Sequence, residues 1–580
     1  MSDPAPPAAR SALAPLRLPV FRWLWIAAVV SNIGSWMQTV GAQWFLVDNQ
    51  SSPTVIALVQ TAAAAPVLLF GLGAGVISEL FNRRRLLIGV QAFQVCIGFG
   101  LAALTASGAM TSALLLVATF LIGSANALQL PAYMALVPEI VPRPLISDAA
   151  TLSSIGVNIA RAVGPAIAGI AIARLGVPFV FAVNAATFGM FLAVLVVWRD
   201  YRPPRQRAEP FLDAARAGLR YVRYAGVIRR LYVQLALFMI PANALWALLP
   251  VIASRQLGVD ANGYGLLLFA VGAGATAGAF VTGTARRRLG ASKLVMTSSV
   301  VYGAGMVCVA LSHSMAATLV VLVAVGVAWI GVIATINGVV QSFLPGWVRA
   351  RGLSVYQVTL FGCTALGSAI AGALGTVLGV SLTMTVAGAV AIASGAVLLV
   401  RPLLSTADRD RAVVAVPLTD LPTFSAGEPD DPEERGAAVG IEVAAGGDRA
   451  EPDEGRSAIP LVTMDDGDFA GQMTPVPGAG RTLVLVRYVV PQSRRPEFTA
   501  HMRLVERSRR RTGARDWQLY TDREHPAELV EAFTLGSWRE HLSQHESRHT
   551  GDDVALLALA RDLAVGDPVV AHLVAVEATT

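Results

Sequence analysis

The chain has 580 residues, of which 54% are hydrophobic and 14% are charged, and its mean hydropathy is +0.58. Such an excess of apolar residues excludes an ordinary soluble globular protein. The formal net charge of +6 would favour a nucleic-acid partner in a soluble protein. Here the arginines fall in short loops between apolar runs, so membrane topology explains the charge and we expect no nucleic-acid partner.

Apolar runs of about 20 residues recur between positions 19 and 403, and each is long enough to cross about 30 Å of hydrocarbon. Breaking these runs at Pro, Gly and Arg clusters predicts twelve transmembrane helices in two sets of six, an all-α polytopic membrane fold. The first set covers 22–47, 54–79, 86–106, 110–134, 149–172 and 177–198. The second set covers 227–252, 262–284, 292–313, 315–340, 354–378 and 380–403.

The two ends of the predicted spans differ in charge. Arginines gather in alternate loops, namely Arg83–Arg85, Arg143, the stretch 199–230, Arg286–Arg288, and Arg349 with Arg351. The positive-inside rule then places both termini in the cytoplasm of a bacterial inner membrane. The Pro/Ala-rich residues 1–18 lack a signal-peptide pattern, so we expect the first span to be an uncleaved anchor.

The two sets of spans are predicted to be a duplication. At a single offset of 203 residues, Gly75 and Arg83–Arg85 align with Gly278 and Arg286–Arg288. The same offset aligns a distant helix motif without gaps, pairing Gly164, Gly169 and Gly176 with Gly367, Gly372 and Gly379. Internal repeats of this kind are typical of transporters.

Composition divides the rest of the chain into tails and linkers. The predicted plan is a cytoplasmic tail at 1–18, six-helix halves at 19–198 and 227–403, a cytoplasmic connector with an interfacial helix at 199–226, a disordered acidic linker at 404–480 and a cytoplasmic α+β domain at 481–580. The three cysteines, Cys96, Cys308 and Cys363, lie in apolar spans, so we expect neither disulfides nor a metal site from them.

The last hundred residues predict a small ferredoxin-like domain. Strands are expected at 483–490, 517–521, 529–535 and 569–576, with helices at 496–510 and from Ser537 and Asp552. Helical spacing would place His541, His545 and His549 on one face, where they could bind a metal, although we interpret the face as solvated. The basic cluster of Arg507 and Arg509–Arg511 is interpreted as a solvated helix end that could also meet anionic lipid or the chain's own acidic linker.

The segment 75–85, GVISELFNRRR, lies between the second and third spans and resembles the loop motif of the major facilitator superfamily. Glu79 stands where that family usually has Asp, and the arginines are present. The resemblance implies that Gly75, Glu79, Arg83 and Arg84 form a cytoplasmic latch, which holds the two halves together in one conformation and releases them in another.

A second motif lies on the fifth span, where Asn158, Arg161, Gly164 and Pro165 resemble the Gly-Pro motif of drug and metabolite antiporters. Small residues permit close helix contact and a proline permits a bend. Through further matches, residues 17 to about 400 resemble the exporter branch that contains the enterobactin exporter, the transmembrane secretion effector family. These matches are Ser35–Gln38, Trp44, Ser52, Pro53, Pro131, Ala132 and Val141–Arg143, and some members share a tail motif like that at 537–546.

Polar residues on the first span form a stripe, since Asn32, Trp36, Thr39 and Gln43 are spaced four, three and four apart. Polar groups facing lipid are costly, so the stripe should line a cavity or hydrogen-bond another helix. Further candidates for substrate binding are Asn126, Gln129, Asn243, Trp246, Asn337 and Gln341. We predict no catalytic residue, resident metal or cofactor.

Arg161 lies well inside the fifth span, where an unpartnered arginine costs at least roughly 2.5 to 3.5 kcal/mol. It could be a gating or coupling charge, or it could pair structurally with Asp148, Glu139 or another carboxylate. The fourth span has no arginine like that of many proton antiporters, which leaves proton coupling an open alternative.

Taken together, these features predict a secondary active transporter that works by alternating access on a small molecule in the lipid bilayer. Export of a drug, siderophore or secondary metabolite is the expectation that the resemblance supports, and import is the alternative. No G-x-x-x-x-G-K-[ST] segment is present, so direct ATP drive is not expected. The tail could be a monooxygenase-like enzyme or a regulatory module that self-associates.

Overall fold

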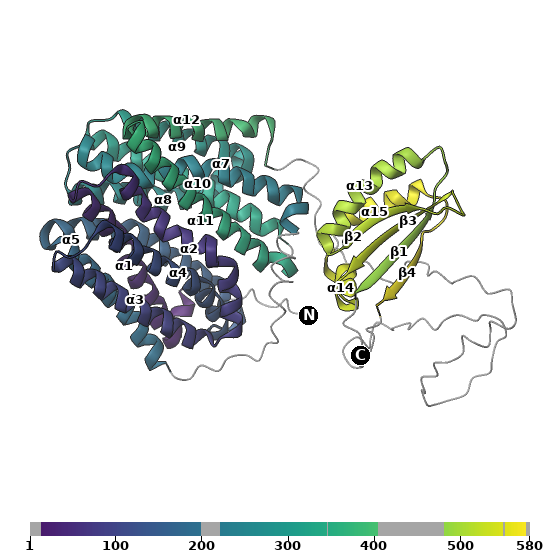
Figure 1. Cartoon of the computed structure of the whole chain (residues 1–580), viewed down its shortest axis with the longest axis horizontal. Coiled ribbons are helices and arrows are strands. Elements are labelled where there is room, and N and C mark those ends of the chain that lie inside the picture. Colours follow the sequence, from purple (N-terminus) through teal and green to yellow (C-terminus); the bar gives the residue numbers. More distant parts are fainter. Residues whose placement is uncertain (1–12, 199–220, 345, 404–480, 549–550, 576–580) are drawn as a thin grey trace, which may run out of the picture. The chain divides into compact units, whose positions relative to one another are not determined.

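Long apolar helices make up the first part of the chain. The computed structural model describes residues 13–198, 221–344, 346–403, 481–548 and 551–575. The chain divides into two compact units, Met1–Arg409 and Asp410–Thr580. Figure 1 shows the helices of the first unit in purple to green and the small sheet of the second in yellow-green.

The helices of the first unit follow the predicted spans. The first half contains η1 (Ala14–Arg17), α1 (Pro19–Asp48), α2 (Pro53–Leu80), α3 (Arg83–Ala106), α4 (Ser112–Ile140), η2 (Arg143–Leu145) and α5 (Ile146–Val197). The second half contains α7 (Gly226–Val251), η3 (Ile252–Gln256), α8 (Ala261–Leu289), α9 (Ala291–Leu311), α10 (Met315–Phe343), α11 (Gly346–Val377) and α12 (Val380–Val400). The helices α4, α8 and α11 run five or more residues past their predicted spans at the arginine-rich ends, because a helix can continue beyond the hydrocarbon.

The helix α5 accounts for two predicted spans. Its 52 residues would be about 78 Å long if straight, which is more than twice the thickness of a bilayer core. The chain breaks at Gly176, where φ is 80° and ψ is 169°, a conformation that glycine adopts readily. Ten described helices are apolar and long enough to cross a membrane. This count includes α5 once and leaves out α1, which carries the polar stripe. Counting α1 and both parts of α5 gives the twelve predicted spans.

The predicted duplication is visible in the backbone and in the helix contacts. Gly176 and Gly379 both have positive φ, 80° and 87°, and each stands at a turn between two spans. A Cβ at Gly164 of α5 would meet α1, and a Cβ at Gly367 of α11 would meet α7, which is the equivalent helix of the second half. The two six-helix pseudo-repeats are thereby confirmed.

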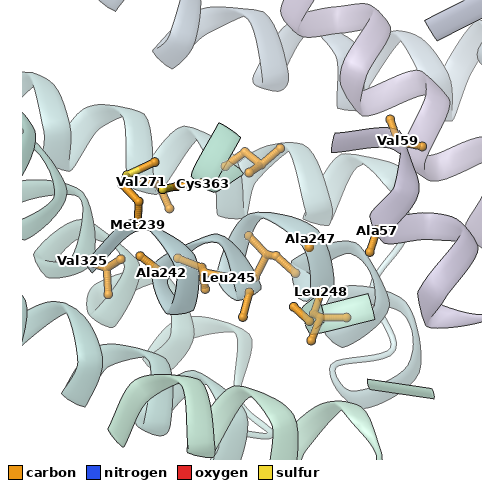
Figure 2. Packing of buried hydrophobic residues seen from close by; sticks show 14 of the residues in the cluster. Ala57, Val59, Met239, Ala242, Leu245, Ala247, Leu248, Val271, Val325 and Cys363 are labelled. Carbon is orange, nitrogen blue, oxygen red and sulfur yellow. The ribbon is translucent and has the colours of Figure 1, made fainter. Parts of the chain in front are cut away.

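Two equivalent helix pairs join the halves. Gly169 of α5 packs on the backbone of Ala261 in α8, and Gly372 of α11 packs on Ala57 in α2. Figure 2 shows Ala57 and Val59 on the purple ribbon of α2, with Leu245, Ala247 and Leu248 on the adjacent ribbon of α7. These side chains belong to one buried hydrophobic cluster that includes residues of both halves. The halves therefore meet through apolar surfaces with small residues at the closest points.

The second unit has the predicted ferredoxin-like topology. Its elements are β1 (Thr482–Val489), α13 (Arg495–Thr512), β2 (Arg515–Thr521), β3 (Glu528–Leu535), α14 (Trp538–Ser543), η7 (Gln544–Arg548), α15 (Gly551–Leu563) and β4 (Val569–Val574). The strand order is β2-β3-β1-β4 and all neighbours are antiparallel. Side chains of β1 are buried at alternate positions. Two of them, Val484 and Val486, share a hydrophobic core with Phe498 and Met502 of α13.

The interpretation of the basic cluster as a solvated helix end is wrong for Arg509, which is 6% exposed. Its Nε donates to Glu531 Oε1 at 3.0 Å, and Trp517 Nε1 donates to the same oxygen at 2.8 Å. Burial acts to lower the pKa of Arg509, but the carboxylate of Glu531 raises it above its ordinary value. The last turn of α13 therefore points one charge into the core, where a paired charge is tolerated.

Several predicted segments lie outside the described residues. They are the tail up to residue 12, the connector at 199–220, the linker at 404–480 and His549. Residues 72–80 are described as part of the α2 backbone, but their side chains, including that of Glu79, lie outside the description.

Candidate functional site

The C-terminal end of the stripe on α1, around Gln43, faces the second half of the bundle. Gln43 is 1% exposed, and its Nε2 donates to the carbonyl of Trp246 in α7 at 3.2 Å. The hydroxyl of Tyr264 in α8 donates to Gln43 Oε1 at 2.7 Å. Both ends of one buried amide are thus used to join α1 to α7 and α8.

Aromatic rings continue from this contact into the second half. Trp36 of α1 lies 5.9 Å from Trp246 of α7 between ring centroids, and Trp246 lies 5.8 Å from Trp329 of α10. Behind Trp329 stand Tyr302 at 5.7 Å and Phe238 at 6.0 Å, both fully buried. The three indoles are only half-buried. Tryptophans that pack at their backs and keep an accessible face are suited to line a ligand site.

Arg161 of α5 reaches the first of these rings. Its guanidinium carbon lies 6.0 Å from the centre of Trp36, within the range of a cation–π interaction. Within the described part of the chain no carboxylate forms an ion pair with Arg161. Glu139, one of the predicted partners, instead forms an ion pair with Arg83. The remaining residues of the stripe, Asn32 and Thr39, bond to carbonyls four residues back on α1.

The Gly-Pro motif lies where α5 crosses both α1 and α8. A Cβ at Gly164 would come within 2.7 Å of Trp36 Cβ, and a Cβ at Gly265 of α8 would come within 2.7 Å of the Pro165 carbonyl. One turn further along α5, a Cβ at Gly169 would come within 3.0 Å of Gly265 Cα. The motif therefore combines contact with the stripe residue Trp36 and close packing between the halves.

The loop motif is described from Asn82 onward. Asn82 caps α3 by accepting from the amide of Arg85, and Arg83 binds Glu139 and the carbonyl of Ala135 on α4. Arg84 donates to the carbonyls of Leu195 and Val196, at 2.8 and 3.1 Å. In this conformation the two arginines bond inside the first half, so the latch between the halves stays a prediction.

The other predicted polar residues bond within their own helix or to a neighbouring helix of the same half, or lack a described partner. Gln94 Nε2 donates to Asn126 Oδ1 at 2.7 Å between α3 and α4, and Gln129 Oε1 is buried on the same face of α4 without a hydrogen bond. Asn243 bonds to the carbonyl of Met239 on its own helix, as Asn158 does to that of Ser154. Gln341 and Asn337 bond to each other at 3.0 Å.

Three residues of the site were not predicted from the sequence. Trp329, Tyr264 and Tyr302 occur singly in apolar spans, without a polar stripe to mark their helix faces. A polar-tipped aromatic residue in an otherwise aliphatic span is the signal that could have found them, because its N–H or O–H needs a partner.

Two of the three histidines predicted to share a helix face are buried, so the interpretation of that face as solvated is wrong for His541 and His545. His541 and His545 are 0% and 4% exposed, and their rings lie 4.8 Å apart. The third neighbour is His572 of β4, 4.7 Å from His541. Among the described residues, the group with metal-ligand spacing is Asp522 and His525 of the β2–β3 loop with Glu528 at the start of β3. Glu528 forms an ion pair with Arg487 at 3.1 Å.

Twelve spans in two pseudo-repeats, meeting over a surface of tryptophans, amides and one arginine, define a membrane transporter of the major facilitator type. A family model described as transmembrane secretion effector matches residues 10–422 and 457–580. The chain therefore belongs to the transmembrane secretion effector family, and the match extends over the α+β unit.

Relatives with known roles are also transporters and not enzymes. The staphyloferrin A transporter of Staphylococcus aureus is 22% identical over 61% of this chain and 89% of its own length. The multidrug efflux pump Tap of Mycolicibacterium fortuitum is 26% identical over 63% of this chain and 93% of its own. The enterobactin exporter of Salmonella choleraesuis is 25% identical over 50% of this chain and 73% of its own length. The chain is accordingly a multi-pass transporter of small molecules.

Solved structures confirm the fold. A bacterial homologue of the human lysosomal transporter Spinster, inward-facing and occupied, covers 68% of this chain and 98% of its own, with a TM-score of 0.54 at 14% identity. The POT family transporter PepTSo covers 66% of this chain and 97% of its own, with a TM-score of 0.56 at 11% identity. Both are similar to the helical unit in fold.

Proposed function

We propose that this transporter exports a small molecule, such as a siderophore, drug or secondary metabolite, by alternating access. The observation that carries the proposal is the contact surface of the two halves, where half-buried Trp36, Trp246 and Trp329 meet beside Arg161. A site between two pseudo-repeats becomes accessible from either side as the halves rock. Relatives named as a siderophore exporter and a drug efflux pump support the outward direction.

The described conformation is closed at the end away from the arginine loops. There Thr54 Oγ1 and Thr376 Oγ1 are 2.7 Å apart across α2 and α11, and Arg255 donates to the carbonyl of Ser51 at 2.9 Å. The positive-inside rule makes the arginine side cytoplasmic, with both termini there, in a bacterial inner membrane. In an exporter, closure at this end belongs to the part of the cycle in which substrate enters from the cytoplasm.

Ion coupling by antiport is part of the proposal. The helical unit has no nucleotide-binding segment, so an ion gradient is the expected energy source. Arg161, on the helix that contacts both α1 and α8, is the proposed coupling charge, because the groups that balance its positive charge can differ between conformations. Whether protons are the coupling ion would be tested by collapsing the pH gradient during transport.

The experiment compares accumulation of fluorescent drugs and siderophores in cells expressing the wild type, Trp36→Ala and Trp23→Ala. Trp23 lies on the same helix but is 53% exposed, which makes it a matched control. We expect the wild type and Trp23→Ala to lower accumulation and Trp36→Ala to restore it. Higher accumulation with the wild type would reverse the direction. Equal effects of both substitutions would refute the proposed site.

We further propose that the α+β unit pairs with a second copy through the face of its sheet that the helices leave uncovered. Register places Leu485, Ala532 and Ala571 side by side on that face, and Tyr520 and Leu573 nearby are 52% and 51% exposed. Leu573→Asp should reduce cross-linking between copies in membranes, whereas Arg523→Asp in the exposed β2–β3 loop should not. No cross-linked dimer in the wild type would contradict this.

A further inference from the structure

The candidate site contains one fixed positive charge near the middle of a span. Arg161 is separated by 15 residues from both Ile146, where α5 begins, and Gly176, where its first span ends. At about 1.5 Å per residue it is roughly 22 Å from either end of that span. A charge at this depth is costly and normally marks a functional group with a definite partner.

The described residues provide only weak compensation for this charge. The ring of Trp36, at 6.0 Å, offers a cation–π contact. Asn158, one turn away, uses its amide on the carbonyl of Ser154. No described carboxylate pairs with Arg161. A single indole face is weak compensation for a guanidinium that is partly buried in a membrane span.

Pseudo-symmetry shows that the charge is not a requirement of the fold. The position equivalent to Arg161 in the second half is Thr364 of α11, whose hydroxyl bonds to the carbonyl of Leu360 at 3.0 Å. The two helices make equivalent packing contacts through Gly164 and Gly367. The packing is therefore satisfied by a neutral side chain in one half, while the other half carries a cation.

We propose that Arg161 binds the anionic group of the substrate, and that the substrate is an organic anion with an aromatic or flat apolar body. The guanidinium would hold a carboxylate or similar oxyanion through charge-assisted hydrogen bonds. Trp36, Trp246 and Trp329, with centroids 5.9 and 5.8 Å apart, would hold the apolar body by stacking. The inference rests on the proposed function for the location of the site, but not on the direction of transport.

Equilibrium binding to the purified full-length protein in nanodiscs tests the inference. The probes are aromatic carboxylates, each matched with its neutral primary amide: 1-naphthoate, 2-naphthylacetate and indole-3-acetate. We expect the wild type to prefer at least one carboxylate over its amide by about tenfold or more, the range of one charge-assisted hydrogen bond. Arg161→Gln should lose that preference while it keeps amide binding, and Arg161→Lys should retain part of it.

Arg174→Gln is the matched control, since Arg174 is an exposed arginine on the same helix outside the site. It should behave as the wild type. A wild type without preference for any carboxylate, or an Arg161→Gln variant that keeps the preference, would overturn the inference. Binding is measured without transport, so carboxylate selectivity together with unchanged cellular accumulation would reject export and leave the inference standing.

Discussion

At the scale of single residues, the clearest link between sequence and site is Gln43. Its side-chain amide donates to the carbonyl of Trp246 and accepts from the hydroxyl of Tyr264, and Tyr264 is fully buried. Replacement by leucine of similar size would leave a buried hydroxyl without its acceptor, at a cost of about 1 to 3 kcal/mol. Gln43→Leu should therefore lower the thermal stability of the detergent-solubilised protein.

Thr39→Val is the control for this prediction, because the Thr39 hydroxyl bonds only to the carbonyl of Ser35 on its own helix. Its effect should be clearly smaller. If both variants unfolded at the temperature of the wild type, the bridge from α1 to α7 and α8 would contribute nothing to stability.

His572 gives the α+β unit a dependence on pH. Burial lowers the pKa of His572, and the positive charge of Arg509 lowers it further. Its ring contacts those of His541 and Trp538. Below the ordinary histidine pKa of about 6.5 the unfolded chain binds a proton that the folded chain resists, so the free energy of unfolding falls as the pH drops. Above that pH the contribution is constant.

Urea unfolding of residues 481–580, followed by the fluorescence of Trp517 and Trp538, measures this effect at pH 7.5 and 5.5. The loss should be at most about 1 kcal/mol per pH unit, and His572→Gln should reduce it. His525→Gln, in an exposed loop, should leave it unchanged. If the wild type and His572→Gln lost the same free energy of unfolding between pH 7.5 and 5.5, groups other than His572 would be responsible for the loss.

At the scale of elements, most boundaries were predictable because apolar length and loop arginines are local signals. The break in α5 was also predictable, since Gly176 and Pro178 interrupt an otherwise continuous helical run. Contacts between elements were harder to predict. Nothing local to Trp329 shows that it meets Trp246, and nothing local to Arg509 shows that it is buried against Glu531. Both depend on which faces of distant elements meet, and periodicity does not specify that.

The crossing of α5 and α8 depends on small residues. A valine at Gly169 would clash with the carbonyl of Ala261, because a Cβ there lies only 2.7 Å away from that backbone atom. Gly169→Val should separate the halves at this point and reduce transport at least about tenfold, as close packing between moving helices requires. Gly100→Val on α3, where a Cβ meets nothing within 4 Å, is the matched control. Transport by Gly169→Val equal to that of Gly100→Val would show that this crossing is not needed.

At the scale of the whole transporter unit, alternating access requires that the end now closed should separate during each cycle. Thr54 and Thr376 lie on opposite halves with their hydroxyl oxygens 2.7 Å apart. Cysteines at both positions, in a chain whose native cysteines are replaced by alanine, would be close enough for a disulfide. Oxidation should abolish transport, because the halves could no longer separate at this end, and reduction should restore it.

A cysteine pair at Ser312 and Thr318 is the control for the cross-link. Their hydroxyl oxygens are 3.0 Å apart but both residues belong to the second half, at the start of α10 and the loop before it. A disulfide there constrains no motion between the halves, so transport should survive oxidation. If the disulfide between positions 54 and 376 formed completely and transport continued at the wild-type rate, separation at this end would not be part of the cycle. The two helical halves would then have to admit and release substrate by a smaller, local movement around the tryptophans.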